Sequence, residues 1–357
     1  MEFLFEYGLF FSKVITLLIA VIVLVAVVAG FSQRNRQPES GHIEVTSVNE
    51  AIDNLTRNLK HLVLNPEVRK QEQKEEKKRA REERKLLKKT SGDSGEEKSR
   101  VFVVNFTGDL QASAVSALRE EVTAIMSVAR KGKDEVVVRL ESMGGTVHGY
   151  GLAASQLKRI TSQEVSLTVA VDKVAASGGY MMACIGSRII AAPFAILGSI
   201  GVVAQLPNFN RLLKNKDIDV ELLTAGEYKR TLTMFGENTK KGREKFVDEL
   251  EDIHLLFKNL IAENRPQVDV EKVATGESWY GTRALEHDLV DELMTSDEFI
   301  SNKCTEANVY LVKYVVQKNK LEKIIERFTS ILSKTFGIRS QLDVPLAQAD
   351  SMDRFRI

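Results

Sequence analysis

Two glycine-rich loops contain the groups that could form a hydrolytic site. The first follows the apolar run VVVRLE and contains Ser142, Gly144 and Gly145. Successive glycines at the end of a strand let backbone N–H groups turn outward, as stabilisation of an oxyanion requires. The second loop follows VSLTVAVDKV and places Ser177 before Gly178, at the start of an apolar helical segment. A serine at such a helix N-terminus suits a nucleophile, although each loop alone is also typical of a tight strand-to-helix turn.

A serine nucleophile needs a base, and the histidines of this chain do not provide an obvious one. Of the five, only His148 lies near a candidate loop, and an ordinary surface position suits it better. Lysine acts as a base only where desolvation favours its neutral form, and most lysines here lie in charged runs. Lys229 differs, because it follows the apolar run DVELLTA at 219–225. Its neighbour Arg230 keeps an exposed loop lysine open as the alternative.

The composition excludes several other classes of protein. The chain has 50 Lys and Arg against 49 Asp and Glu, which argues against binding nucleic acid by phosphate neutralisation. Two cysteines, Cys184 and Cys304, cannot form a disulfide framework or a cysteine-based zinc site. Neither an HExxH motif nor a GxxxxGK[ST] phosphate loop occurs. We therefore expect neither a metal ion nor a cofactor.

Short β-branched runs alternate with helical patterns between residues 101 and 293, which predicts an α/β domain with a mainly parallel sheet. Ligands of such sheets bind beyond the carboxyl ends of the strands, where both glycine-rich loops are expected. The uncharged segment 189–209 is long enough for a membrane span, but its prolines and glycines predict a buried strand and loop. The expected strands are 101–106, 135–141, 165–171, 188–193, 219–225 and 308–316, and the expected helices include 115–125 and 246–260.

The N-terminal part predicts a membrane anchor and a charged stalk. Residues 14–31 carry no charge and are about as long as a transmembrane helix, while Glu2 and Glu6 argue against a cleaved signal peptide. Apolar residues from Val48 to Leu62 recur at alternating spacings of four and three, which predicts a helix. This stripe either pairs with a copy of itself or rests on its own domain. Interleaved acidic and basic residues at 67–89 predict a solvated helical spacer.

These patterns divide the chain into four parts. Residues 1–33 form the transmembrane anchor, and residues 34–99 form the charged helical stalk and linker. Residues 100–300 form the domain with the candidate loops. Residues 301–357 contain a C-terminal strand, an amphipathic helix and a flexible tail. Arginines and the basic stalk follow the span, so the positive-inside rule favours a cytoplasmic catalytic domain.

Four ordered motifs resemble those of the signal peptide peptidase A family. They are Ser142-Met143-Gly144-Gly145, Ala176-Ser177-Gly178-Gly179-Tyr180, Gly198-Ser199-Ile200-Gly201 and Gly226-Glu227-Tyr228-Lys229. The resemblance covers nearly the whole chain and is strongest from residue 101 to residue 293. It implies an α/β fold similar to Clp protease and crotonase, with a repeated β-β-α-type core, preceded here by one transmembrane helix and a charged helical stalk.

The resemblance also implies roles for individual residues. Ser177 corresponds to the nucleophile and Lys229 to the general base of a Ser–Lys dyad, and Ser199 to the residue that holds the lysine amine. The implied oxyanion donors are backbone N–H groups of Gly144, Gly145 and Gly178. Two positions depart from the family pattern. The family commonly has Pro where this chain has Met143, which frees the oxyanion loop, and Gly where it has Asp288, which tolerates a left-handed backbone.

The function expected from the residues and the resemblance is that of a membrane-anchored serine endopeptidase. Its substrates would be extended peptides, such as signal-peptide remnants or unfolded proteins, and its protomers would share sites in a homo-oligomer. We expect the bacterial inner membrane, with the catalytic domain on the periplasmic side that the resemblance favours and the charge pattern opposes. A catalytically silent crotonase-fold scaffold is the first alternative. An acyl-CoA-processing enzyme of crotonase type is the second, although it would not need both Ser177 and Lys229.

Overall fold

The computed structural model describes residues 5–17, 41–65, 67, 68, 74, 78, 82 and 98–316. The chain divides into two compact units, one of residues 1–42 and 315–332, and one of residues 43–314 and 333–357. In the smaller unit, residues 5–17 are helical and exposed. No helix among the described residues is long and apolar enough to cross a bilayer. Most of the expected anchor at 14–31 lies outside the described residues, as does the amphipathic helix expected at 321–332.

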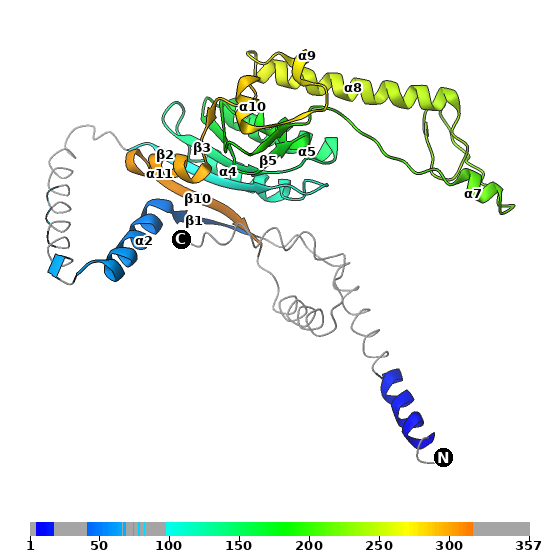
Figure 1. The fold of residues 1–357 in the computed structure, drawn as a ribbon, viewed down its shortest axis with the longest axis horizontal. Coiled ribbons are helices and arrows are strands. Elements are labelled where there is room, and N and C mark those ends of the chain that lie inside the picture. The colour runs from blue at the N-terminus through cyan, green and yellow to red at the C-terminus, as the bar shows by residue number, and fades with distance from the viewer. Residues whose placement is uncertain are drawn as a thin grey trace. The chain divides into compact units, whose positions relative to one another are not determined.

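Seven strands form the main sheet of the larger unit (Figure 1). Their order is β1-β10-β2-β3-β4-β6-β9, and the pairs from β10 to β9 are all parallel. This confirms the mixed α/β fold with a mainly parallel sheet. The strands are β1 (His42–Ser47), β2 (Arg100–Thr107), β3 (Glu135–Glu141), β4 (Ser166–Val171), β6 (Arg188–Ala191), β9 (Glu292–Leu293) and β10 (Asn308–Val315).

Helices cover both faces of this sheet, because the central strands bury alternate side chains in two separate clusters. Val104 and Phe106 of β2 join the cluster that includes helices α4, α5 and α6, whereas Val103 packs with Phe299 of α11 on the other face. Strands buried on both faces are typical of parallel sheets. We call the sheets and the helices around them the body of the protein. Its helices are α4 (Val115–Met126), α5 (Val147–Thr161), α6 (Gly178–Ala183), α9 (Val270–Val273), α10 (Gly281–Glu286) and α11 (Ser296–Glu306).

A second, smaller sheet is built from short strands that follow long ones. β5 (Val174–Ala176) follows β4, and β7 (Ile196–Gly198) follows β6. Together with β8 (Ser278–Tyr280) they form a three-stranded sheet in the order β5-β7-β8. β5 and β7 are parallel, and β8 runs antiparallel to β7. As a result, the chain leaves β5 directly into the second glycine-rich loop, and the segment 189–209 begins as the expected buried strand.

An arm extends away from the body (Figure 1). Its core is α8 (Lys240–Asn264), which buries Phe257 and Ile261 in its C-terminal part. The chain runs out to α7 (Asn210–Lys214) and back to the start of α8, and almost every residue from 203 to 230 is exposed. The strand expected at 219–225 is wrong, since these residues form no strand. A β-branched apolar run forms a strand only against a partner strand and a core, and the arm has neither.

Helix α2 (Val48–Val63) confirms the helix predicted for the stalk. Its first turn is fastened to the body, because the Asn49 amide donates to the carbonyls of Cys304 and Ala307 at 2.9 and 3.1 Å. The Asn49 side-chain oxygen accepts from the Val309 backbone N–H at 2.8 Å. Farther along the apolar stripe the side chains are exposed, up to 84% at Leu62. This part of the stripe does not rest on its own domain.

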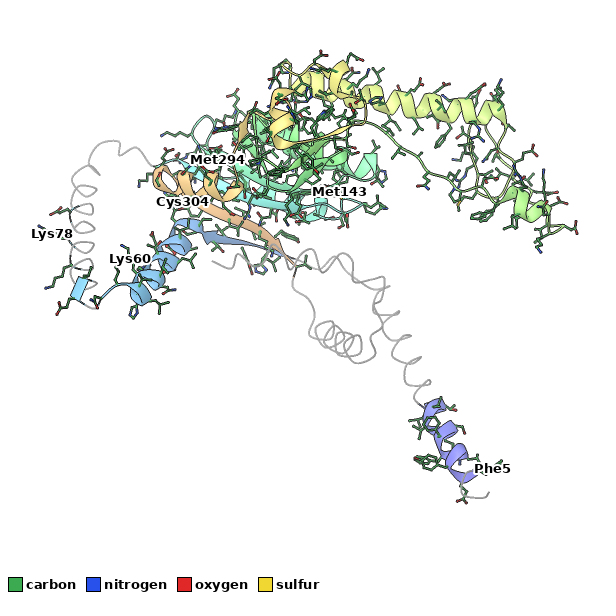
Figure 2. The ribbon with its side chains drawn as sticks, in the orientation of Figure 1. Phe5, Lys60, Lys78, Met143, Met294 and Cys304 are labelled. Atoms are coloured by element: carbon green, nitrogen blue, oxygen red, sulfur yellow. The ribbon has the colours of Figure 1, made fainter. Side chains whose placement is uncertain are left out.

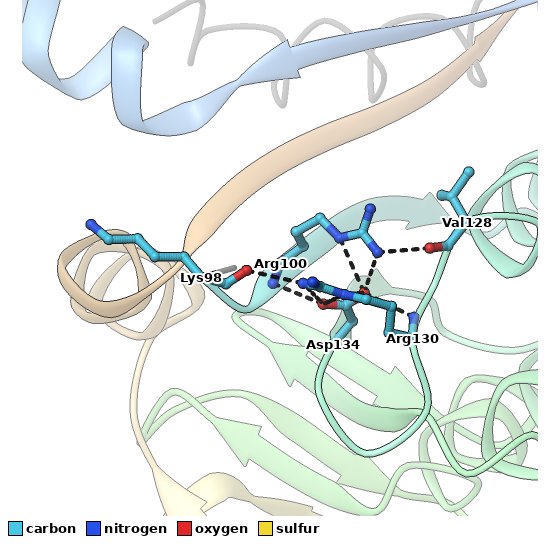
Figure 3. Close-up of polar contacts among 5 residues, drawn as sticks. All are labelled: Lys98, Arg100, Val128, Arg130 and Asp134. Atoms are coloured by element: carbon cyan, nitrogen blue, oxygen red, sulfur yellow. Dashed lines mark hydrogen bonds and ion pairs between the residues drawn. The ribbon is translucent and has the colours of Figure 1, made fainter. Parts of the chain in front are cut away.

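A buried carboxylate fastens the start of β2 (Figure 3). Asp134 is 2% exposed and receives hydrogen bonds from the guanidinium groups of Arg100 and Arg130. Arg100 also donates to the Val128 carbonyl at 2.7 Å, and Arg130 donates to the Lys98 carbonyl at 2.9 Å. Burial raises the pKa of Asp134, but the hydrogen bonds from Arg130 and Arg100 outweigh it and hold the pKa well below the ordinary value. The ionised carboxylate therefore stabilises the entry of the chain into the sheet.

We expect Asp134→Asn to lower the free energy of unfolding at pH 7 by about 2 to 4 kcal/mol, because both guanidinium groups lose their charged partner. Because the folded-state pKa is depressed, the contribution is fully present above the ordinary carboxyl pKa, declines as pH falls below that value, and is lost as pH falls through the folded-state pKa. Denaturant unfolding between pH 7 and pH 3 should show a smaller loss of stability for the variant than for the parent. Asp297→Asn is the control and should change stability little, because the Asp297 side chain is 57% exposed and its ion pair with Arg139 is long, at 3.7 Å. A variant as stable as the parent at pH 7 would contradict this role.

Candidate active site

The two glycine-rich loops meet where β3 and β5 end. Ser142 directly follows β3 and forms an isolated parallel bridge with Ala175. The Ser142 backbone N–H donates to the Val174 carbonyl at 2.8 Å, and the Ala176 N–H donates to the Ser142 carbonyl at 3.0 Å. The expectation that both loops lie at the carboxyl ends of strands is therefore confirmed. Because these bonds join the backbones themselves, the spacing of the loops does not depend on a flexible side chain.

Beyond this bridge the backbones come closest at Gly144. A Cβ atom on Gly144 would lie 2.8 Å from the Ser177 Cβ, 2.7 Å from the Gly178 N and 2.8 Å from the Ala176 carbonyl oxygen. Gly144 also has a φ of +88°, which disfavours any residue with a side chain. Glycine is required here for two independent reasons. The structure thus brings the first loop directly against Ser177.

Ser177 and Ser199 occupy equivalent positions on neighbouring strands. Ala176 and Gly198 are partners in the β5–β7 register, and the Ser177 N–H donates to the Gly198 carbonyl at 2.8 Å. The Ser199 N–H is bound in turn to the Glu277 carbonyl at 2.6 Å. Both serines have left-handed backbones, with φ of 52° and 49°. Non-glycine residues held in this region are strained, and such strain concentrates at functional sites.

The three expected oxyanion glycines differ in whether their backbone N–H is available. The Gly144 N–H donates to the Ser142 hydroxyl oxygen at 3.0 Å and is therefore occupied. Within residues 98–316, the N–H groups of Gly145 and Gly178 have no hydrogen-bond acceptor. Gly178 directly follows Ser177, and Gly145 follows Gly144, which contacts Ser177. The geometry leaves these two amides free to bind a developing negative charge.

The outer side of the first loop lies against the segment after β2. A Cβ atom on Gly145 would lie 2.2 Å from the Leu110 carbonyl oxygen, and the Thr146 N–H donates to that oxygen at 2.8 Å. Met143, at the turn of the loop, points outward and is 75% exposed (Figure 2). The Met143 side chain therefore does not hold the loop in place.

Lys229 is not brought to Ser177 within one chain. It is exposed on the arm, where its neighbour Glu227 pairs with Lys241 in the first turn of α8. Phe257 lies more than four helical turns beyond Lys241 along α8, or about 24 Å. It is Phe257, at this far end, that shares a groove with Met181 of α6. Figure 1 shows α7 and this end of α8 far from the body. The Ser177 hydroxyl has no hydrogen-bond partner among the described residues.

Other groups near Ser177 do not replace the lysine. The thiol of Cys184 is fully buried behind the loop, and this burial raises its pKa to about 12, so it is not a competing nucleophile. His148 is exposed near the start of α5, as expected of a surface histidine. No group of three His, Cys, Asp or Glu side chains in the described part of the chain is placed to hold a metal ion.

An apolar groove of about 360 Å³ lies beside the two loops, between α5, α6 and α8. Val147 at one wall follows the first loop, and Met181 at another lies one turn after Ser177. At the opposite end, the Lys158 amine donates to the Asn264 side chain at 2.6 Å. The remaining apolar lining residues are Gly151, Ala154, Ile185, Ile253, Leu256, Phe257 and Leu260. Such a groove can accept an apolar side chain of a bound peptide.

Sequence comparison connects this geometry with known proteases. Residues 2–157 match the family described as Peptidase family S49 N-terminal, and residues 159–310 match Peptidase family S49. The Probable protease SohB of Haemophilus influenzae is 47% identical over 350 residues, which cover 94% of this chain and 99% of that protein. The Probable protease SohB of Buchnera aphidicola subsp. Acyrthosiphon pisum is 48% identical, and the match covers 94% of this chain and 97% of that protein.

Among solved structures, a mutant of the 1510-N membrane-bound stomatin-specific protease is 13% identical. The match covers 58% of this chain and 85% of that one, with a TM-score of 0.38.

We expect Gly144→Ala to reduce kcat for peptide hydrolysis at least about 100-fold, since the added Cβ would push the first loop away from Ser177 and Gly178. Hydrolysis of a fluorogenic peptide measures this loss. Met143→Ala, one residue away in the same loop, is the control and should keep most of the activity because its side chain is exposed. Wild-type kcat in Gly144→Ala would show that the two loops do not act together.

Proposed function

The chain belongs to peptidase family S49, and from this premise we propose that it is a membrane-anchored serine endopeptidase in which Ser177 and Lys229 form the catalytic dyad. Membership of the family makes it a protease. The observation that carries the proposed mechanism is that Ser177 is strained and half-buried where the two loops meet, and that each loop has one free backbone N–H group. The repeated passage from a long strand to a short one supports a fold of the Clp and crotonase type.

In the proposed reaction, the Ser177 oxygen attacks the carbonyl carbon of the scissile peptide bond and its proton passes to the neutral Lys229 amine. The oxyanion that forms accepts hydrogen bonds from the Gly145 and Gly178 N–H groups. The C–N bond then breaks as Lys229 returns the proton to the leaving nitrogen, which gives an acyl-enzyme. Lys229 then takes a proton from water, whose oxygen attacks the ester carbon. As the bond to the Ser177 oxygen breaks, Lys229 returns the proton to that oxygen, and the acid is released. The Ser199 hydroxyl orients the lysine amine.

The lysine of this dyad comes from a neighbouring protomer. Two observations support this arrangement. The arm holds Lys229 away from Ser177 of its own chain, and it exposes large apolar side chains that a monomer would leave in water, including Val203 and Leu223 at 89% each. Contact between the arm and a second copy buries this surface and completes the site. In a closed ring every protomer both gives and receives a lysine.

The substrate class follows from the access to such a site. A ring restricts entry to extended chains, and the apolar groove beside Ser177 accepts an apolar side chain near the scissile bond. Signal-peptide remnants and unfolded proteins combine both properties. Folded proteins, which bury their apolar side chains and present no extended backbone, are excluded.

The anchor is proposed from the uncharged run at 14–31 and places residues 100–300, the peptidase domain, next to the bacterial inner membrane. Deletion of residues 14–31 should release the protein from membranes washed with alkaline carbonate. We place the peptidase domain on the periplasmic side. Protease added to spheroplasts should then digest it, and protection of the domain would reverse this assignment.

We expect Lys229→Arg to reduce kcat at least about 100-fold, because a guanidinium group stays protonated and cannot accept the serine proton. The unfolding transition should not change, since Lys229 is exposed in the protomer. Arg230→Lys is the matched control at the next residue and should remain active. Fluorophosphonate labelling of the parent and of Ser177→Ala tests the nucleophile in the same preparation. Full activity of Lys229→Arg would exclude the dyad, and absence of labelling in the parent would favour a silent scaffold.

Mixing two inactive variants tests whether protomers share their sites. Ser177→Ala and Lys229→Ala proteins are dissociated, mixed and reassembled, and peptide hydrolysis is measured. If the dyad crosses the boundary, interfaces that pair an intact Ser177 with an intact Lys229 restore part of the activity. Each variant reassembled alone is the control. Assembled mixtures, verified by sedimentation, that recover no activity would show that each protomer holds its own dyad.

A further inference from the structure

Tyr150 touches both loops of the candidate site, yet the reaction described above does not use it. It belongs to α5 and is fully buried, with 0% exposure. Its hydroxyl lies 2.5 Å from the Ser142 hydroxyl oxygen and donates to the Asp109 carbonyl at 2.8 Å. A buried tyrosine usually finds one hydrogen-bond partner for its hydroxyl. This one has two, and one of them belongs to the first glycine-rich loop.

The direction of the hydrogen bonds is determined by the number of protons. Tyr150 has a single hydroxyl proton, which it donates to the Asp109 carbonyl, so the Ser142 hydroxyl must donate to the Tyr150 oxygen. The Ser142 oxygen in turn accepts the Gly144 N–H at 3.0 Å. A directed chain therefore runs from Gly144 through Ser142 and Tyr150 to Asp109. Burial raises the pKa of Tyr150, so the phenol stays protonated and keeps this direction at neutral pH.

This chain limits the movement of the free Gly145 N–H. The preceding amide, at Gly144, is tied through Ser142 to Tyr150, and the following amide, at Thr146, is tied to the Leu110 carbonyl at 2.8 Å. The peptide unit that carries the Gly145 N–H is thus held on both sides. The exposed side chain of Met143 contributes no such restraint, so these two hydrogen bonds provide the support of the loop.

The ring of Tyr150 also sets the position of the second free amide. A Cβ atom on Gly178 would lie 2.4 Å from the Tyr150 Cγ, so the ring occupies the place of a side chain at this residue. The ring also makes an edge contact with Phe106 of the core, with centroids 6.5 Å apart. One side chain of the rigid body therefore supports the residues that carry both free N–H groups.

We propose that Tyr150 is a positioning residue that sets the spacing of the two oxyanion donors: its hydroxyl fixes Gly145 through Ser142, and its ring fixes Gly178. This inference rests on the proposed function, because it takes Ser177 as the nucleophile between these donors. A positioning role differs from a packing role in what the loss of the hydroxyl alone should do. A variant that keeps the ring keeps the packing. It loses the hydrogen bond through Ser142 that holds the Gly145 N–H in position.

Tyr150→Phe separates the two roles, since it keeps the ring against Phe106 and Gly178 and removes only the hydroxyl. We expect kcat for a fluorogenic peptide to fall about 10- to 100-fold, with KM changed less than about twofold. Affinity for a peptide aldehyde, whose adduct with Ser177 places an oxygen between the donors, should fall by a similar factor. Affinity for the same peptide without an electrophile should not change.

Two further variants test whether the loss of kcat comes from lower stability and whether it is transmitted through Ser142. Tyr180→Phe removes the hydroxyl of another fully buried tyrosine, which donates to the Leu289 carbonyl at 3.0 Å, and should lower the thermal unfolding midpoint similarly while kcat stays within about twofold. Ser142→Ala removes the hydroxyl that links Gly144 to Tyr150 in the directed chain, so its kcat should match that of Tyr150→Phe. The double variant should lose no more than either single one, because both remove the same support.

The outcomes distinguish this inference from the function on which it rests. If Ser177 of the parent does not react with a fluorophosphonate, the proposed function fails and the inference fails with it. If Ser177 reacts and Tyr150→Phe retains the parent's kcat and aldehyde affinity, only the positioning role is overturned. Equal losses of kcat in Tyr150→Phe and Tyr180→Phe would also overturn it, since the effect would then come from stability.

Discussion

The approach of two backbones at Gly144 and Ser177 is the constraint on which the site depends. It exists because β3 and β4 are parallel neighbours whose carboxyl ends lie at the same edge of the main sheet. β5 follows β4 closely, so the residue after β3, Ser142, can bridge to Ala175 of β5. Two backbone hydrogen bonds to Ser142 then leave too little room for a Cβ at Gly144. This contact brings the loop that carries the free Gly145 N–H against the loop that carries Ser177 and the free Gly178 N–H.

The body and the arm divide the requirements of catalysis between them. The body is held by buried clusters on both faces of the sheet and by ionic anchors such as Asp134, so it can keep strained backbones at Ser177 and Ser199. The arm buries little of its own surface and carries the proposed base. In the proposed assembly, a protomer alone would have the nucleophile without its base, which would restrict peptide cleavage to the assembled enzyme.

Much of the fold follows from local sequence patterns, and much of the site does not. The buried strands were predictable because apolar residues occupy both faces. The left-handed backbone at Asp288 (φ 57°) agrees with the glycine that the resembled family commonly has at this position. The run at 219–225 has the composition of a strand but no partner strand, and it forms none. The prediction that Lys229 follows a strand was therefore wrong. The connection from Ser142 to Tyr150 and Asp109 joins three segments, and no sequence spacing indicates it.

In the proposed mechanism the base for Ser177 comes from another chain, and a cross-link between residues 177 and 229 can show which chains these two residues belong to. In a Cys304→Ala background, Ser177→Cys and Lys229→Cys are combined in one chain, and the assembled protein is treated with a short bifunctional maleimide. Cys184 is fully buried and serves as an internal control for accessibility. If the dyad is shared between chains, we expect covalent dimers and higher multiples on a denaturing gel. A monomeric band in which peptide mapping finds the two positions joined within one chain would contradict it.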